Sequence, residues 1–392
     1  MTDLDSLTAS LLFAYTRTLS PPNFAFSQIY IPFLNLPRSA ISLRPEFTSV
    51  CSHGGFATSS LLTLTDIQSG FSSPEKIRWI LVDHNKLQGH LGQQFSQYVT
   101  GVIDHHDEEN TVPRDTDPEP RILEKAGSCT SLVVRYCRQT WDAISLSSPS
   151  TGAAHGQGES AVDDEAVTRV WDAQIAKIAV ASILVDTANL RPPGRVEQVD
   201  RDAVEYLEGR ITLIPREAKD WVRDRFFKEL QEAKGMIEGL MLGEILKKDY
   251  KMWSEGERKL GMSSVVKDLR FLIRKAEAEG DESKKHEPFE NVLNEVMDEE
   301  GLEVFAIMTT STTHHGDFQR ELLIQARPSA HESVKRFLDT AVKELELEEM
   351  HVGAVAKIDL SSADVWRNTW RQKELSKGRK QVAPLLRDAI RG

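Results

Sequence analysis

Short segments that combine carboxylates with imidazoles recur along this 392-residue chain, and together they could bind metal ions. Residues 101–109 are GVIDHHDEE, in which Asp104 is followed directly by His105 and His106. Similar segments are TDLDS near the start, LVDHN with Asp83, and ILVDTANLR further on. Carboxylate oxygens with some imidazole nitrogen, and no thiolate among them, are the donors that Mg²⁺ and Mn²⁺ prefer.

Each segment taken alone also has an ordinary structural explanation. Asp5 could cap a helix, Asp83 and Asp186 could form turns, and His84 could lie at the surface. Four carboxylates and an imidazole at the ends of core elements, however, are what a pair of divalent ions needs. Two such ions about 3.5–4 Å apart bind a bridging water and stabilise an in-line displacement at phosphorus. The four segments together therefore predict a metal site that acts on phosphate.

The elements that must position these residues are two strands and the helices around them. The apolar runs IRWILVD, ending at Asp83, and YVTGVID, ending at Asp104, predict buried parallel strands. Apolar residues at helical spacing follow Asp5 and Ser6 and recur in AQIAKIAVASILVDT. This alternation favours an α/β fold with a doubly wound parallel sheet. In such sheets ligands collect at the carboxyl ends of the strands, where Asp83 and Asp104 are expected.

Composition limits the classes of partner and location. Hydrophobic residues make up 40% and charged residues 28%, which is typical of a soluble globular protein long enough for two domains. The net charge of -12 argues against nucleic acid or a membrane as partners. Three cysteines without metal-site spacing indicate reduced thiols. The acidic start is unlike a signal peptide and no apolar run is long enough to span a membrane, so we expect a cytoplasmic protein.

The chain changes character twice. SLSSPSTGAAHGQGESAVDD predicts a mobile surface insertion, and long charged helices are expected after about residue 215. The strands LEVFAIMTT and ELLIQA and the helix HESVKRFLDTAVKEL predict a mixed α+β unit with a small sheet. The expected division is therefore a first domain over residues 1–215, a helical connector over 216–245 and a smaller α+β domain over 246–392.

The order of the motifs resembles that of the DHH phosphoesterase superfamily. This order is D-x-D-S, D-H-N, D-H-H, G-S-C-x-S-L-V and D-T-x-N. ILKKDYK, LGMSSVVK and GRKQVAPLL are similar to its type 2 DHH-associated domain. NLPRSAISLRPEF, GSCTSLV and RKQVAP resemble the fungal-type exopolyphosphatases within it, and family II inorganic pyrophosphatases share the metal motifs. The resemblance implies a DHH domain followed by a substrate-binding domain, with the active site in the cleft between them.

The resemblance also implies roles for single residues. Its metal ligands are Asp3, Asp5, Asp83, His105 and Asp186. Asp83 would bridge two divalent ions, Mn²⁺ or Mg²⁺. His106 would face the substrate phosphate and help to protonate the leaving group, whereas Asp104 would orient a neighbouring histidine.

Binding of a polyanion requires local positive charge. Residues 361–392 contain eight Lys and Arg against three Asp and Glu. The candidate substrate-binding cations are Arg379, Lys380, Lys267, Arg320, Lys247 and Arg38. The alternative for each is a solvated basic residue, although guanidinium groups in particular pair well with phosphate oxygens.

The resulting prediction is a monomeric exopolyphosphatase that releases orthophosphate from the ends of inorganic polyphosphate. One alternative is a pyrophosphatase or nucleotide phosphohydrolase that uses the same metals. An alternative of another class is a catalytically weak regulatory or binding relative. Phosphate release from long polyphosphate, tripolyphosphate and pyrophosphate would separate these alternatives.

The start of the chain departs from the family pattern. In the superfamily a strand and a short loop precede D-x-D, and the loop carries an Asn or His four residues before the first aspartate. Here only two residues precede Asp3. We therefore expect an N-terminally shortened form that is poorly active or unstable, with an exposed sheet edge and with Asp3 and Asp5 on a fraying terminus.

Overall fold

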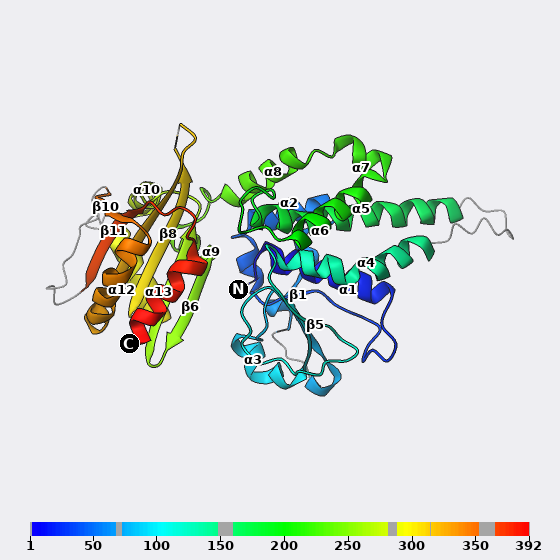
Figure 1. Ribbon diagram of the computed structural model, residues 1–392, viewed down its shortest axis with the longest axis horizontal. Helices are drawn as coiled ribbons and strands as arrows, with labels where there is room; N and C mark the ends of the chain where they lie inside the picture. The colour runs from blue at the N-terminus through cyan, green and yellow to red at the C-terminus, as the bar shows by residue number, and fades with distance from the viewer. Residues whose placement is uncertain are drawn as a thin grey trace. The chain divides into compact units, whose positions relative to one another are not determined.

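The chain forms two compact units, Thr2–Lys234 and Gly235–Gly392, which are described separately (Figure 1). The computed structural model describes residues 2–67, 73–147, 160–280, 288–313, 315–352 and 365–391. The predicted connector lies on both sides of the division between the units, and the three-part division expected from the sequence stays a prediction.

A parallel sheet with helices on both faces forms the centre of the first unit. Its strand order is β3–β4–β5, and both pairs are parallel, which confirms the two predicted strands. Ile80 and Ile103 pack into a core with helices α1, α4 and α5, whereas Leu81 and Val102 pack on the opposite side with α3. The predicted doubly wound arrangement is therefore confirmed, and among the described residues this sheet has three strands.

The elements of the first unit follow in chain order. They are α1 (Leu4–Leu19), β1 (Phe33–Leu34), α2 (Pro45–His53), β2 (Leu62–Thr63), β3 (Trp79–Val82), α3 (Gly89–Phe95), β4 (Val99–Asp104), β5 (Arg121–Leu123), α4 (Cys129–Ser147), α5 (Ser160–Asp186), α6 (Gln198–Thr212), α7 (Pro215–Asp220) and α8 (Arg223–Gly235). The charged segment expected to form long helices after residue 215 is thus broken into short ones. The expected mobile insertion is helical at both ends, in α4 and α5, and residues 148–159 lie outside the described residues.

Helix α1 begins with a reciprocal cap. Asp3 accepts hydrogen bonds from the backbone N–H groups of Asp5 and Ser6, and the Ser6 side chain bonds back to the Asp3 backbone. The cap is therefore Asp3, and Asp5 instead lies buried in the first turn. The expectation that both aspartates lie on a fraying terminus is wrong for this structure, because the cap and the burial hold this turn in place.

The second unit is built on a mixed sheet. Within the described residues its order is β10–β11–β9–β8–β7–β6, and only the β7–β8 pair is parallel. The expected small sheet is therefore wrong in size, because this sheet has six strands. The elements are α9 (Leu242–Lys248), β6 (Tyr250–Glu255), β7 (Arg258–Val265), α10 (Leu269–Glu279), α11 (Pro288–Glu300), β8 (Val304–Thr312), β9 (Phe318–Ala326), α12 (His331–Glu344), β10 (Leu347–Glu349), β11 (Trp366–Gln372) and α13 (Arg379–Arg391).

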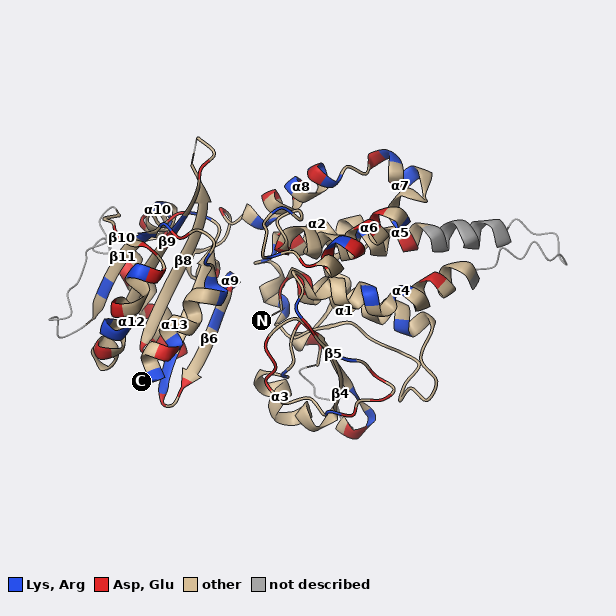
Figure 2. Ribbon diagram, viewed as in Figure 1, with Lys and Arg blue, Asp and Glu red and all other residues tan. Residues whose placement is uncertain are grey.

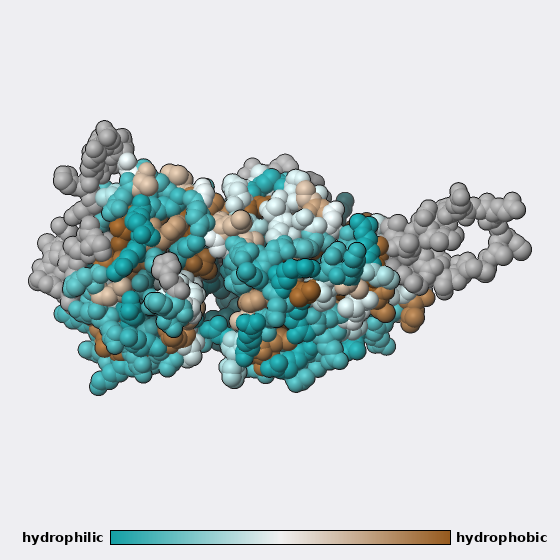
Figure 3. All heavy atoms as spheres, turned by 90° about the horizontal axis from the view of Figure 1, so that it is seen from above, coloured by the Kyte–Doolittle hydropathy of each residue, from teal (hydrophilic) through white to brown (hydrophobic). Residues whose placement is uncertain are grey.

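Helices cover both faces of this sheet. Val304 and Ala306 of β8 pack with α12 and α13, which cover the face turned to the viewer in Figure 1. Phe305 and Ile307, which alternate with them, pack on the other face with α9, α10 and α11. The surface visible in Figure 3 is mostly hydrophilic, and the hydrophobic residues on it form separate groups. No helix in the described parts of the chain has the length and apolar character needed to cross a membrane.

Candidate metal centre

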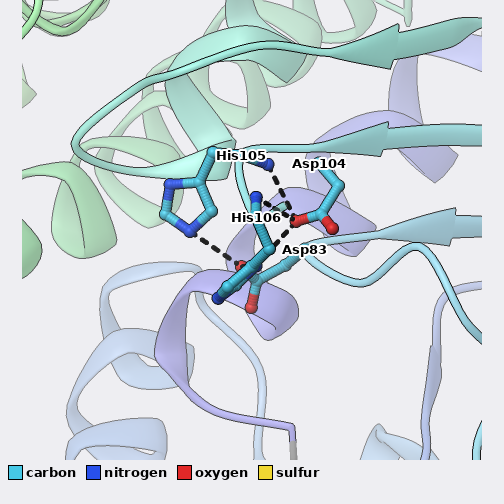
Figure 4. Close-up of side chains that lie close together, drawn as sticks. All are labelled: Asp83, Asp104, His105 and His106. Carbon is cyan, nitrogen blue, oxygen red and sulfur yellow. Dashed lines mark hydrogen bonds and ion pairs between the residues drawn. The ribbon is translucent and has the colours of Figure 1, made fainter. Parts of the chain in front are cut away.

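The ends of β3 and β4 bring four predicted residues together. One potential ligand atom from each of Asp83, Asp104, His105 and His106 lies within 4.8 Å of the others (Figure 4). The two strands are parallel neighbours, with Val82 paired to Ile103, so their carboxyl ends meet at one edge of the sheet. Carboxylate oxygens and imidazole nitrogens so close together are a suitable donor set for a divalent cation.

Asp83 lies at the centre of this cluster. Its backbone has a φ of 63°, a left-handed conformation that aspartate tolerates better than most residues, and its N–H donates to the Ile103 carbonyl at 3.0 Å. Its Oδ2 accepts a 2.6 Å hydrogen bond from Ser6 Oγ, and its Oδ1 lies 3.3 Å from His105 Nε2. Burial and the nearby charges of Asp3 and Asp5 raise the pKa of Asp83 to about 8. The carboxylate form therefore requires a compensating positive charge.

His105 is oriented by a backbone carbonyl. Its Nδ1 lies 3.0 Å from the carbonyl oxygen of Ala126, which can only accept a hydrogen bond, so Nδ1 carries the hydrogen. In the neutral ring this leaves the lone pair on Nε2, which faces Asp83 Oδ1. A carbonyl that fixes one imidazole nitrogen while the other faces a carboxylate is typical of a metal-binding histidine.

Asp104 organises the loop that carries both histidines. Its Oδ1 accepts hydrogen bonds from the backbone N–H groups of His105 and His106 and from His106 Nδ1, the last at 2.8 Å. Its Oδ2 accepts one from Asn85 Nδ2 at 2.7 Å. Burial alone would raise the pKa of Asp104, but the hydrogen bonds from His106 and Asn85 lower it to about 2. Asp104 is therefore ionised and holds the His106 ring.

The other three predicted ligands interact with this cluster through their charges and make different contacts of their own. Asp3 caps α1 through Oδ1. Both oxygens of Asp5 accept hydrogen bonds from residues 128–130 at the start of α4. Asp186, at the end of α5, has a buried Oδ2 without a hydrogen-bond partner. Burial and the charges of Asp5 and Asp3 raise the pKa of Asp186 well above its usual value.

This surplus of buried negative charge fits divalent cations. Asp83 and Asp186 both carry raised pKa values, and part of the cause is the charge of neighbouring aspartates. An orphaned buried carboxylate oxygen is costly unless a donor or a metal ion satisfies it. The residues present therefore fit the predicted metal ions. The roles of the individual ligands stay predictions.

Sequence reasoning did not assign roles to several residues at this site. Ser6 and Thr130 bond directly to Asp83 and Asp5, and both were part of recognised motifs. A buried ring of hydroxyls joins Thr130 to Thr8 and Ser182, and so links α4 to α1 and α5 beneath Asp5. On α8, the charge of Lys234 offsets part of the rise in the pKa of Asp186 that burial and the charges of Asp5 and Asp3 cause, and nothing in the surrounding sequence distinguishes this lysine.

The candidate phosphate-binding cation of the first unit has a structural contact. Arg38 Nη2 lies 2.6 Å from Asp66 Oδ2 and donates to the Leu61 carbonyl, while Nη1 donates to the Ser59 carbonyl. These bonds tie the short helical turn at Arg38–Ile41 to the segment around Asp66. A role in substrate binding would require Arg38 to leave several of these partners.

The candidate cations of the second unit are mostly paired with acidic or carbonyl oxygens. Arg379, the first residue of α13, contacts Asp249 Oδ1 at 2.7 Å, and the next residue, Lys380, is exposed. The remaining contacts are Lys247 with Glu299 at 2.5 Å, Lys267 with Glu238 at 2.6 Å, and Arg320 Nε with the Leu375 carbonyl at 2.8 Å. Figure 2 shows basic residues along α13 and β6 with acidic residues among them. Phosphate would have to compete with these partners.

Comparison with known proteins identifies the class of the second unit first. Residues 228–389 match the model of the DHHA2 domain. The whole chain has the fold of a Methanococcus jannaschii protein whose crystal structure is described as a "putative family II inorganic pyrophosphatase", with a TM-score of 0.58 and 18% identity over 100% of this chain and 97% of the other. The predicted resemblance to DHH proteins with a type 2 associated domain is thereby confirmed.

Two curated relatives are similar in sequence. A Schizosaccharomyces pombe protein named "Putative exopolyphosphatase" is 28% identical over 393 residues, which cover 99% of this chain and 88% of that protein. The Mus musculus protein "Exopolyphosphatase PRUNE1" is 25% identical over 278 residues, which cover 70% of this chain and 52% of that protein. The names of these relatives and of the M. jannaschii protein are those of phosphoric anhydride hydrolases, which confirms the predicted likeness to this class of enzyme.

Chelation of bound metal should make the stability of the protein depend on pH. The pKa of Asp83 is raised from 3.8 to about 8 in the metal-free fold, so the folded state binds a proton that the unfolded state has lost. The free energy of unfolding should therefore fall as pH rises through this interval. We expect thermal scans in chelator to show a lower Tm at pH 8 than at pH 5, and added Mn²⁺ to restore Tm at pH 8.

The matched control is Asp83→Asn, which cannot ionise at this position. Its metal-free Tm should decline less between pH 5 and pH 8 than that of the wild type. A wild-type Tm that rises over this interval, or that responds to pH as the variant does, would contradict the assignment of this buried charge.

Proposed function

We propose that this chain is a metal-dependent hydrolase that cleaves terminal phosphoanhydride bonds of inorganic polyphosphate and releases orthophosphate. The observation that carries the proposal is the cluster of Asp83, Asp104, His105 and His106 at the ends of two parallel strands. The partnerless buried oxygen of Asp186 beside it supports a site for cations. The cytoplasmic location and the monomeric state expected from the sequence belong to the same proposal.

The proposed ligands of two Mn²⁺ or Mg²⁺ ions are Asp3, Asp5, Asp83, His105 and Asp186. When bound, such ions lower the pKa of a water molecule so that it can attack phosphorus. Asp83 would be the central ligand of this set, because it is buried and lies within range of the charges of Asp3 and Asp5. Ser6 and the Ala126 carbonyl hold Asp83 and His105 in place before any ion binds.

His106 is proposed to give a proton to the leaving phosphate. Its Nδ1 is 2.8 Å from the ionised carboxylate of Asp104, and this contact fixes the plane of the ring. The ring is about one-third exposed, unlike that of His105, so its Nε2 can reach a substrate. A positioned general acid contributes roughly 10²–10⁴-fold to such a reaction.

Polyphosphate is proposed as the substrate because positive charge is available in the second unit. Arg379 and Lys380 at the start of α13 are proposed to bind phosphate, with Lys267, Lys247 and Arg320 as further contacts, and Arg38 in the first unit. The name of the S. pombe relative supports this choice. Pyrophosphate is the second candidate substrate, favoured by the similarity to the fold of the M. jannaschii protein.

A substrate panel separates these two candidates. Purified protein is incubated with long-chain polyphosphate, tripolyphosphate or pyrophosphate and with Mn²⁺ or Mg²⁺, and both orthophosphate and the remaining chain lengths are measured. We expect orthophosphate from long chains, with the chains shortened one unit at a time. Release of orthophosphate from pyrophosphate alone would show that pyrophosphate, and not polyphosphate, is the substrate. Metal binding without any turnover would favour the regulatory alternative.

Replacement of Arg379 by alanine should raise the KM for polyphosphate about ten- to a hundredfold, since a charge-assisted contact contributes roughly 1.5–3 kcal/mol. Asp249→Asn should act in the opposite direction, because Asp249 competes with phosphate for Arg379. An exposed ion pair contributes roughly 0.2–1 kcal/mol, so we expect KM to fall by no more than about fivefold.

The control for this pair is Lys247→Ala, which removes a cation whose partner, Glu299, is largely exposed. Its effect on KM should be smaller than that of Arg379→Ala. Equal small effects for the two alanine variants would indicate a diffuse basic surface in place of a specific phosphate contact at Arg379.

A further inference from the structure

The loop before α4 contacts two of the proposed metal ligands. The carbonyl oxygen of Ala126 accepts the hydrogen bond from His105 Nδ1 at 3.0 Å. Two residues further on, Ser128 Oγ donates to Asp5 Oδ1 at 2.6 Å, and Thr130 Oγ1 donates to the same oxygen at 2.7 Å. The position of this short loop therefore determines the orientation of one imidazole and one carboxylate.

Asp200 holds the backbone of the same loop. It is fully buried in the first turn of α6. Its Oδ2 accepts a hydrogen bond from the Gly127 N–H at 2.8 Å, and its Oδ1 accepts one from the Ser128 N–H at 3.3 Å. Its Oδ2 also accepts the N–H of Glu197 at 2.8 Å, which ties the carboxylate to the start of its own helix.

Two carboxylates thus share the N–H groups at the start of α4. Those of Gly127 and Ser128 donate to Asp200, and those of Cys129 and Thr130 donate to Asp5 at 2.6 and 2.9 Å. The N–H groups at a helix start have no partners within the helix, and its partial positive charge favours nearby anions. Because the four residues are consecutive, a shift of the pair bound to Asp200 displaces the pair bound to Asp5.

Close packing at Gly127 leaves the loop little freedom. A Cβ atom at this position would lie 2.5 Å from the Arg195 carbonyl, 2.6 Å from Thr187 Cγ2 and 2.7 Å from Asp200 Oδ2. Thr187 directly follows Asp186, so the loop also packs against the end of the helix that carries a third proposed ligand. The three ligands are therefore connected through one loop and its anchor.

We infer that Asp200 is a positioning residue of the metal centre, which acts on Asp5 and His105 through residues 126–130, the short loop before α4 and the first two residues of that helix. This inference rests on the proposed function and adds to it a residue that contacts neither metal nor substrate. Removal of Asp200 should lower the affinity for metal even where the protein remains folded. Residues that orient metal ligands typically change metal affinity by about 10–100-fold when mutated.

The test measures Mn²⁺ binding to metal-free protein by electron paramagnetic resonance, with Tm recorded on the same samples. Asp200→Ala loses all three hydrogen bonds, and we expect its Kd for Mn²⁺ to rise about 10–100-fold. Asp200→Asn keeps one acceptor oxygen and should show a smaller rise. If Asp200→Ala does not fold, Asp200→Asn alone decides, since it preserves the size of the side chain.

The matched control is Asp172→Asn, at another buried carboxylate of the first unit. Asp172 accepts hydrogen bonds from Tyr15, Trp141 and Arg210, and it precedes Asp186 by about 21 Å along α5. This variant should lower Tm but leave Mn²⁺ affinity unchanged. If lost stability alone weakened Mn²⁺ binding, Asp172→Asn would weaken it as much as an Asp200 variant with a similar Tm. If Asp200 positions the metal ligands, only the Asp200 variants should bind Mn²⁺ more weakly.

The outcomes separate the inference from the proposed function. Wild-type Mn²⁺ affinity in both folded Asp200 variants would overturn the inference, whether or not the protein hydrolyses phosphoanhydrides. Wild-type protein that binds Mn²⁺ but cleaves no phosphoanhydride would overturn the proposed function, and the Asp200 comparison would still stand. A wild type that binds no Mn²⁺ would overturn both.

Discussion

Replacement of Asp83 by alanine is expected to lower kcat by several orders of magnitude, because it removes the proposed central ligand of the metal ions that would activate water. The metal-free variant should still fold, because removal of a buried carboxyl group near the like charges of Asp3 and Asp5 offsets part of the cost of placing alanine in the left-handed conformation of residue 83. Steady-state phosphate release and Tm in chelator measure the two effects. A folded Asp83→Ala protein that keeps more than about a tenth of the activity would contradict the proposed site.

His106→Ala should reduce kcat by roughly 10²–10⁴-fold, the contribution expected of a general acid. The Kd for Mn²⁺ should change little, because the ring of His106 is held by Asp104 and is more exposed than that of His105. The pH–rate profile should also lose the fall in rate at high pH that is caused by deprotonation of the general acid. His105→Ala is the matched control, and it should weaken Mn²⁺ binding.

The results for this histidine pair distinguish the two roles. If His106→Ala weakens Mn²⁺ binding as much as His105→Ala does, His106 is a metal ligand and the proposed proton donor is wrong. If kcat and the pH profile are both unchanged, His106 has no part in the reaction.

The meeting of Asp83 and Asp104 at one edge of the sheet could be predicted from the sequence, because it depends on patterns within short segments. Each of the apolar runs before Asp83 and Asp104 ends in polar residues, and parallel neighbours place such ends together. The motif order then indicated the family. The left-handed backbone of Asp83, by contrast, has no signal in the surrounding residues.

Contacts between distant segments could not be predicted in this way. Ser128 and Thr130 lie 123 and 125 residues from Asp5, and only the fold shows that they occupy its oxygens. The acidic partner of Arg379 is likewise 130 residues away. Hydrophobic patterning gives the type of an element but not which polar side chains meet across the fold.

The size of the second sheet was missed for a related reason. β6 and β11 are YKMWSE and WRNTWRQ, in which polar and charged residues interrupt the apolar pattern that identifies a strand. In β11, Arg367 is buried and paired with Glu290 and Gln325, so a charge in the strand does not place it at the surface. The partners that permit this burial lie on other elements.

The most direct test of the central claim follows bound metal and phosphate release in the same sample. Wild-type protein is stripped with chelator, dialysed, and titrated with Mn²⁺ in the presence of long-chain polyphosphate, with Asp83→Ala in parallel. We expect the stripped protein to release no orthophosphate, and activity to return in proportion to bound Mn²⁺ in the wild type only. Full activity without metal, or equal Mn²⁺ binding and activity in Asp83→Ala, would contradict a metal-dependent hydrolase centred on Asp83.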